Sequence, residues 1–142
     1  MTTIRAIVVA AALAAAVPWA SLAGQATLAD AARRARDGWR AHDAGAVVGE
    51  GSRVVLQIPG ADPSVAVSRA QAMALLTRYL RSTVERSVEI RTIREVEGER
   101  GLVELDRRYV VAGTEDVRHE TLFLGFRREG DRWVLAELRG AP

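Results

Sequence analysis

Three polar residues in the C-terminal half of the sequence are of types that could bind or transform a small molecule: Arg107, Tyr109 and Glu120. They lie in two consecutive stretches of alternating apolar and polar residues, a pattern that predicts neighbouring antiparallel strands. The predicted pairing places all three on the apolar face of the sheet, with Tyr109 opposite Glu120 and Arg107 diagonal to Glu120. A guanidinium and a carboxylate in an apolar pocket could orient a ligand that carries a carboxylate or a carbonyl. With Trp39 of the first predicted helix they form the candidate ligand-binding set; an ion pair that only closes the rim of the sheet is the alternative.

Catalysis by the same residues is a second hypothesis. An isomerase-type enzyme uses a carboxylate base together with a tyrosine or a protonated acid that donates to an oxyanion. Glu120 and Tyr109 supply these types, so a small isomerase- or hydrolase-like enzyme is one interpretation. The predicted register opposes it, because the two residues pair across the sheet instead of flanking a cavity. No catalytic residue is assigned, and a non-catalytic domain that binds a small molecule or a protein partner is the preferred hypothesis.

The composition argues against several other classes of site. The sequence has no cysteine and two histidines, His42 and His119. Neighbours on a strand point to opposite faces, so His119 and Glu120 cannot ligate one metal ion, and no metal site is expected. No glycine-rich phosphate loop or nucleophile elbow is present, and no cofactor is expected. The 20 basic residues are interleaved with 18 acidic ones, which predicts no nucleic-acid interface.

The N-terminus has the layout of a secretory signal peptide over residues 1–23, with cleavage as late as residue 26. Arg5 precedes an unbroken apolar run over residues 6–17, and small residues follow it. This run is short for a membrane span, so an uncleaved anchor is the less favoured alternative and no stable anchor is expected after cleavage. The interpretation implies a bacterial protein exported to the periplasm or the extracellular space, with a single domain over residues 24–142.

A helix over Ser68–Val84 is the central predicted element. Ser68 and Gln71 have the spacing of a capping box, and Met73, Leu76, Leu80 and Val84 recur at helical spacing. The other predicted helices and the first strand cover residues 27–42, 46–49 and 53–58.

Four further strands are predicted over residues 87–96, 101–112, 117–128 and 132–139. The short polar links between them contain glycine, which predicts hairpins and therefore an antiparallel meander. The predicted register pairs Leu105 with Leu124 on an apolar face that also carries Val134. The opposite face is predicted to carry Phe123, Trp133 and Leu135, a candidate patch for a homodimer. A shifted register that places some of these three in the core is the alternative.

This order of elements resembles the cone-shaped α+β fold of the nuclear transport factor two superfamily, which includes ketosteroid isomerases, scytalone dehydratases and SnoaL-like proteins. The resemblance spans roughly residues 27–139. Within it, the strand over 54–58, the Pro59-Gly60 turn and the Ser68-x-x-Gln71-Ala72 helix start resemble a family of exported bacterial proteins of unknown function. The sequence departs from that family where Tyr79-Leu80 replaces a common pair of phenylalanines. The resemblance implies a pocket between the concave sheet face and the helices, and dimerisation through the convex face.

Overall fold

The structure is a computed structural model that describes residues 26–142. The predicted signal peptide lies outside the described residues. Within residues 26–142, no helix combines the length and the apolar character that a membrane span needs.

The first two helices begin at side-chain caps. Helix α1 covers Leu28–Arg40, and Thr27 and Asp30 form a capping box at its start. Its buried face consists largely of small residues, which lets α2 (Ala44–Val48) approach closely: a Cβ atom at Gly38 would lie 2.8 Å from that of Ala46. These observations confirm the first predicted helix and the predicted turn of helix after it.

Helix α3 covers Arg69–Arg81 and begins with the predicted capping box of Ser68 and Gln71. It ends earlier than predicted, because the chain enters strand β3 at Thr83. Val84 therefore lies on a strand and is 46% exposed, so its prediction as part of the apolar helix face is wrong.

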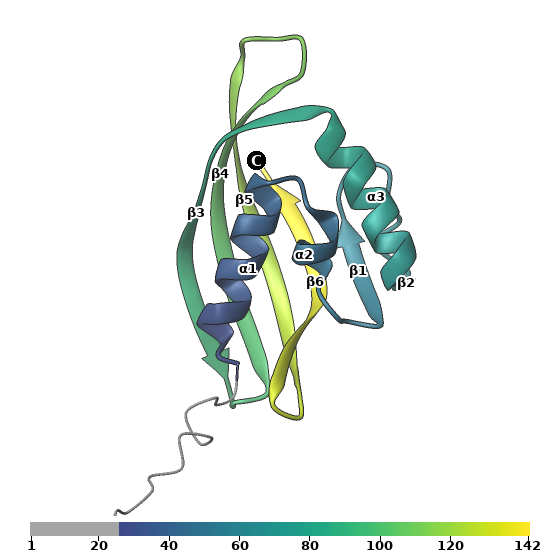
Figure 1. Cartoon of the computed structure of the whole chain (residues 1–142), viewed down its shortest axis with the longest axis vertical. Helices are drawn as coiled ribbons and strands as arrows, with labels where there is room; N and C mark the ends of the chain where they lie inside the picture. Colours follow the sequence, from purple (N-terminus) through teal and green to yellow (C-terminus); the bar gives the residue numbers. More distant parts are fainter. Residues whose placement is uncertain (1–25) are drawn as a thin grey trace, which may run out of the picture.

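The six strands form one sheet in the order β2-β1-β6-β5-β4-β3 (Figure 1). The last four are the predicted antiparallel meander, and β1 joins it through a parallel pairing with β6 that the sequence does not indicate. The bounds are β1 Arg53–Gln57, β2 Val67–Ser68, β3 Thr83–Val96, β4 Arg100–Val111, β5 Val117–Glu129 and β6 Arg132–Ala141.

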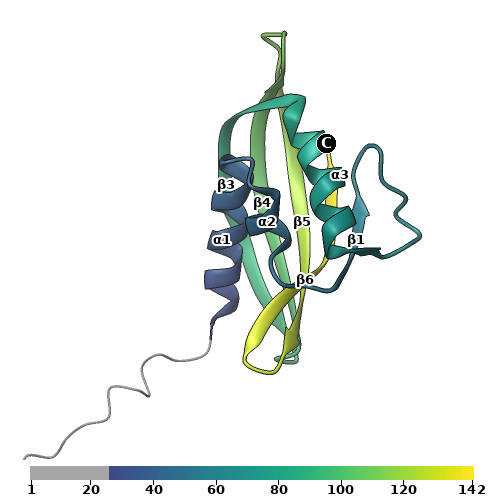
Figure 2. The ribbon, with the colours of Figure 1, turned by 45° about the vertical axis from the view of Figure 1, so that its right-hand side comes forward.

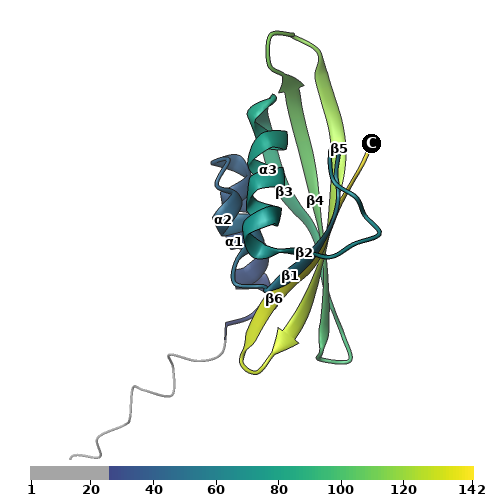
Figure 3. The ribbon, with the colours of Figure 1, turned by 90° about the vertical axis from the view of Figure 1, so that its right-hand side faces the viewer.

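All three helices cover the same face of the sheet, as the edge-on view shows (Figure 3). Helix α1 packs along β3, and α3 packs beside β1. The loop between β1 and β2 projects away from the body of the domain (Figure 2). Leu105 and Leu124 are buried in the core that the helices cover. Val134 is also buried, but it lies opposite Arg127 and outside this core, so its predicted place on the helix-covered face is wrong. The α+β fold, with helices packed on the apolar side of the meander, is confirmed.

The pairing of β4 with β5 differs from the prediction by two residues. Leu105 lies opposite Leu122, and Arg107 lies directly opposite Glu120. Tyr109 pairs with Arg118 and not with Glu120. Because an even shift leaves every side chain on its original face, the predicted faces of these strands are still correct.

A bulge in the β5–β6 ladder changes the face of two predicted surface residues. The register shifts between Gly125 and Phe126, so that Phe126 lies opposite Leu135. Leu135 and Trp133 are 2% and 6% exposed and belong to the hydrophobic core. Their predicted placement on the outer face is therefore wrong, whereas Phe123 does lie outside the core and packs under Arg139. The alternative of a shifted register is the one that the structure bears out.

Candidate functional site

The residues that the sequence singles out meet around the guanidinium of Arg107, inside the cone and near the C-terminal ends of α1 and α3. Glu85 accepts two hydrogen bonds, from Nε at 2.8 Å and from Nη2 at 2.5 Å. Nη1 donates to Glu120 Oε2 at 2.6 Å and to the Tyr79 hydroxyl at 2.9 Å, and Nη2 donates to Thr83 Oγ1 at 2.8 Å. We call these five residues the Arg107 cluster. A guanidinium has five N–H groups, and these five hydrogen bonds use all of them.

Three aromatic rings enclose the same guanidinium. Its central carbon lies 3.8 Å from the ring centre of Tyr109, 5.1 Å from that of Trp39 and 5.4 Å from that of Tyr79. The Arg107 side chain has no exposed surface, so the rings and the hydrogen bonds replace water completely. The four predicted ligand-binding residues are thus brought together, but Trp39 and Arg107 are fully buried.

The electrostatics of the cluster favour a fixed arrangement. Burial alone would lower the pKa of Arg107, but the hydrogen bonds and charge of Glu85, with Tyr79 and Glu120, raise the pKa above its ordinary value. Burial also raises the pKa of Tyr79 to about 12, an effect that Arg107 opposes and Glu120 strengthens. Tyr79 is therefore neutral near pH 7, and its hydroxyl can donate to Glu120 Oε2 at 3.2 Å.

His42 approaches the cluster from the end of α1. Its N–H donates to the carbonyl of Trp39 and the N–H of Asp43 donates to that of Gly38, which is a Schellman motif with His42 in the left-handed region at φ 55°. This turn directs the imidazole to Glu85, with Nε2 3.4 Å from Oε1. The sequence predicted the position of His42 at the helix end but not this neighbour.

Tyr79 and Thr83 were assigned to the predicted helix over residues 68–84, and Glu85 was missed for a different reason. A bulge between Glu85 and Ser87 reverses the alternation of β3, so Glu85 points inward although the pattern from Val88 onward places it outward. Gly140, a glycine within strand β6, is a sequence feature that could have indicated a close contact at this position. A Cβ atom there would lie 2.1 Å from Glu120 Oε1, so the glycine leaves the room in which Glu120 reaches Arg107.

The Arg107 cluster borders a cavity of about 610 Å³ at the open end of the cone. Tyr79, Tyr109, His119 and Glu120 contribute to its lining. Contrary to the prediction, Tyr109 and Glu120 are not paired across the sheet; both flank this cavity. The Glu120 side chain is only 12% exposed and is held by Arg107 and Tyr79, which limits its freedom as a base.

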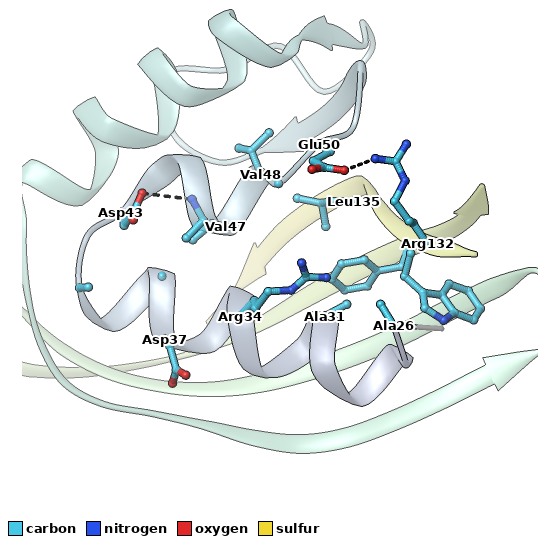
Figure 4. A pocket seen from close by; sticks show the side chains of 16 residues that line it. Ala26, Ala31, Arg34, Asp37, Asp43, Val47, Val48, Glu50, Arg132 and Leu135 are labelled. Carbon is cyan, nitrogen blue, oxygen red and sulfur yellow. Dashed lines mark hydrogen bonds and ion pairs between the residues drawn. The ribbon is translucent and has the colours of Figure 1, made fainter. Parts of the chain in front are cut away.

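A second cavity, of about 550 Å³, lies between α1, α2 and the β5–β6 hairpin (Figure 4). We call it the helix cleft. Its apolar lining comes from Ala31, Val47, Val48, Phe126, Trp133 and Leu135. Trp133 and Leu135, which were predicted to form an outer patch, are thus parts of this cleft.

The polar residues around the helix cleft differ in how they are engaged. Arg132 pairs with Glu50, Asp37 pairs with Arg36, and Asp43 accepts the Ala46 N–H at the start of α2. Arg34 reaches from α1 into the cleft (Figure 4) and makes no hydrogen bond or ion pair within residues 26–142. Among the two arginines of the described lining, Arg34 is the one without an acidic partner.

The outer face of the sheet carries a groove of about 470 Å³. Phe123 and Leu102 line it, and Leu102 is 42% exposed. No cluster of His, Asp and Glu in the described part of the chain is arranged to hold a metal ion.

No protein-family model and no curated protein matches the sequence. Solved structures do match the fold. A DUF4783 family protein from Bacteroides ovatus aligns with a TM-score of 0.60 and 9% identity over 75% of this chain and 90% of that chain. A ketosteroid isomerase-like protein from Erwinia carotovora atroseptica aligns with a TM-score of 0.64 and 16% identity over 81% and 95%. A variant of the protein Rd1NTF2_05 aligns with a TM-score of 0.57 and 15% identity over 77% and 91%.

These similarities agree with the element order, the single helix-covered sheet face and the meander described above. At such low identity they establish the architecture and carry no activity to this chain. The chain has the nuclear transport factor two-like fold.

Proposed function

We propose that this protein is an exported, non-catalytic binding domain that holds a small apolar molecule in the helix cleft. The observation that carries the proposal is the contrast between the two cavities. The Arg107 cluster has no unused guanidinium donor, whereas the helix cleft offers an apolar floor and an unpaired cation. Its volume of about 550 Å³ is in the range of small-molecule sites.

The test uses N-phenyl-1-naphthylamine, an uncharged aromatic probe whose emission rises in apolar surroundings. We expect saturable binding with one probe per chain. An Ala46→Phe substitution should abolish it, because Ala46 is an exposed residue of the cleft lining. Ala112→Phe is the matched control, since Ala112 is an exposed alanine of the β4–β5 hairpin outside the cleft. Equal binding by both variants would contradict the proposal.

A small isomerase-like enzyme remains the second candidate function. It is favoured by one observation, that Tyr109 and Glu120 flank the cavity at the open end of the cone. Such an enzyme would remove a proton next to a carbonyl group, so its action would exchange that proton for deuterium in heavy water. Exchange catalysed by the native protein and lost in Glu120→Gln, with the fold retained, would favour this candidate over the binding domain.

We also propose that two copies associate through the outer sheet face. The exposed Leu102 and the half-buried Phe123 in one groove support this. Light scattering should give twice the monomer mass, and Leu102→Glu should return the protein to a monomer. A native protein that stays monomeric at 100-fold the concentration used in the probe-binding test would refute this proposal.

A further inference from the structure

Arg34 gives the helix cleft a charge preference. Its side chain is exposed at the edge of the cleft and has no partner within residues 26–142. Of the other lining charges, Arg132 pairs with Glu50 and Asp37 with Arg36, while Asp43 has no cationic partner within residues 26–142 and accepts the Ala46 N–H at the start of α2. Within the described lining, Arg34 is therefore the one cation that an incoming anionic group can pair with, since Arg132 already pairs with Glu50.

The apolar lining of the helix cleft next to Arg34 favours a ligand whose uncharged part is apolar. Phe126 and Trp133, each 6% exposed, contribute aromatic side chains to the floor, and the buried Leu135 and Val48 contribute aliphatic ones. Aromatic and aliphatic walls with one placed polar group are typical of sites that hold drug-sized molecules. Neither Arg34 nor this floor belongs to the Arg107 cluster, none of whose five residues lines the helix cleft.

We propose that the natural ligand is an apolar molecule with a single anionic group, and that Arg34 binds this group while the body lies on Phe126 and Trp133. This inference rests on the proposed function, because it names the ligand class of the same cleft. Arg34 acts as a specificity-determining residue: it selects the anionic ligand from uncharged molecules of the same shape.

A matched pair of probes separates the two claims. 8-Anilinonaphthalene-1-sulfonate has the same aromatic body as N-phenyl-1-naphthylamine and differs by one sulfonate. An exposed ion pair contributes a small free energy, so we expect Arg34→Gln to weaken sulfonate binding about threefold. Binding of the uncharged probe should not change. The threefold effect should shrink between 20 mM and 500 mM NaCl, because salt screens exposed charges.

Arg40→Gln is the control for the charge change. Arg40 is an exposed residue of the same helix outside the cleft lining, so its substitution should affect neither probe. If both probes bind and Arg34→Gln weakens neither, or weakens both equally, the ligand class is wrong while the binding domain stands. If neither probe binds in a manner that Ala46→Phe blocks, the proposed function and this inference are both overturned.

Discussion

Substituting Arg107 by methionine tests whether its cluster is structural. Methionine fills a similar volume but removes five hydrogen bonds, which leaves Glu85 and Glu120 without their cation. The side chains of these carboxylates are only 6% and 12% exposed, so water can replace little of what is lost. Removing one partner of a buried ion pair typically lowers the free energy of unfolding by about 3 to 5 kcal/mol.

That loss is large against the roughly 5 to 15 kcal/mol of a typical domain. For a domain of this size it corresponds to a fall in Tm of about 10 °C or more. Most of the cost comes from carboxylates that stay charged in the interior. The triple variant Arg107→Met, Glu85→Gln, Glu120→Gln should therefore recover about 2 kcal/mol or more of the loss, because it removes both orphaned charges.

The assay is urea unfolding of the native protein, the single variant, the triple variant and Arg108→Met. Arg108 is the exposed neighbour on the outer face, and its substitution should change the free energy of unfolding by less than about 0.5 kcal/mol. A loss below about 1 kcal/mol in the single variant would refute the structural interpretation.

Three further predictions follow from single contacts. Tyr79 should titrate near pH 12 in the folded protein and near pH 10 in urea, so the stability that its buried hydroxyl contributes is complete below pH 10 and lost as the pH rises through 12. Absorbance at 295 nm measures this titration in a Tyr109→Phe variant, in which Tyr79 is the one remaining tyrosine. Equal midpoints in the folded and unfolded protein would contradict the prediction. Gly140→Ala should lower the free energy of unfolding by about 1.5 to 3 kcal/mol, because the new methyl group displaces Glu120 from Arg107. Gly125→Ala should cost less, because its new Cβ atom would lie at an ordinary contact distance of 3.5 Å from Glu137 Cβ. The reverse order of the two variants in urea unfolding would contradict this prediction. Ser68→Ala should lower the stability by about 1 kcal/mol through loss of the α3 cap, and an unchanged urea midpoint would show that the capping box contributes nothing.

All elements except β2 were predictable, because each of the others has a local signal. The capping boxes at Thr27 and Ser68 mark the starts of two helices, and alternation over the C-terminal half marks the meander. The side on which Arg107, Tyr109 and Glu120 lie was also predictable, because alternation alone determines the face of a strand. The pairing of Arg107 with Glu120 was not, because an even shift of register changes the partner without changing the face.

The remaining misses arise from irregular backbone. A bulge near Arg86 turns Glu85 inward, and one opposite Gly125 and Phe126 turns Trp133 and Leu135 inward. Neither bulge can be predicted from alternating apolar and polar residues, because a bulge reverses the alternation from which the faces of a strand are predicted. The parallel pairing of β1 with β6 depends on contacts far apart in the chain, so local patterns do not indicate it.

We expect ligands to enter the helix cleft while the Arg107 cluster stays closed. Trp133 lines the cleft and Trp39 lies against Arg107, so their two indole N–H signals in a ¹H–¹⁵N NMR spectrum report on the two sites separately. Adding N-phenyl-1-naphthylamine should shift the Trp133 signal and leave that of Trp39 in place. A shift of the Trp39 signal with Trp133 unchanged would place the ligand inside the cone and contradict the account.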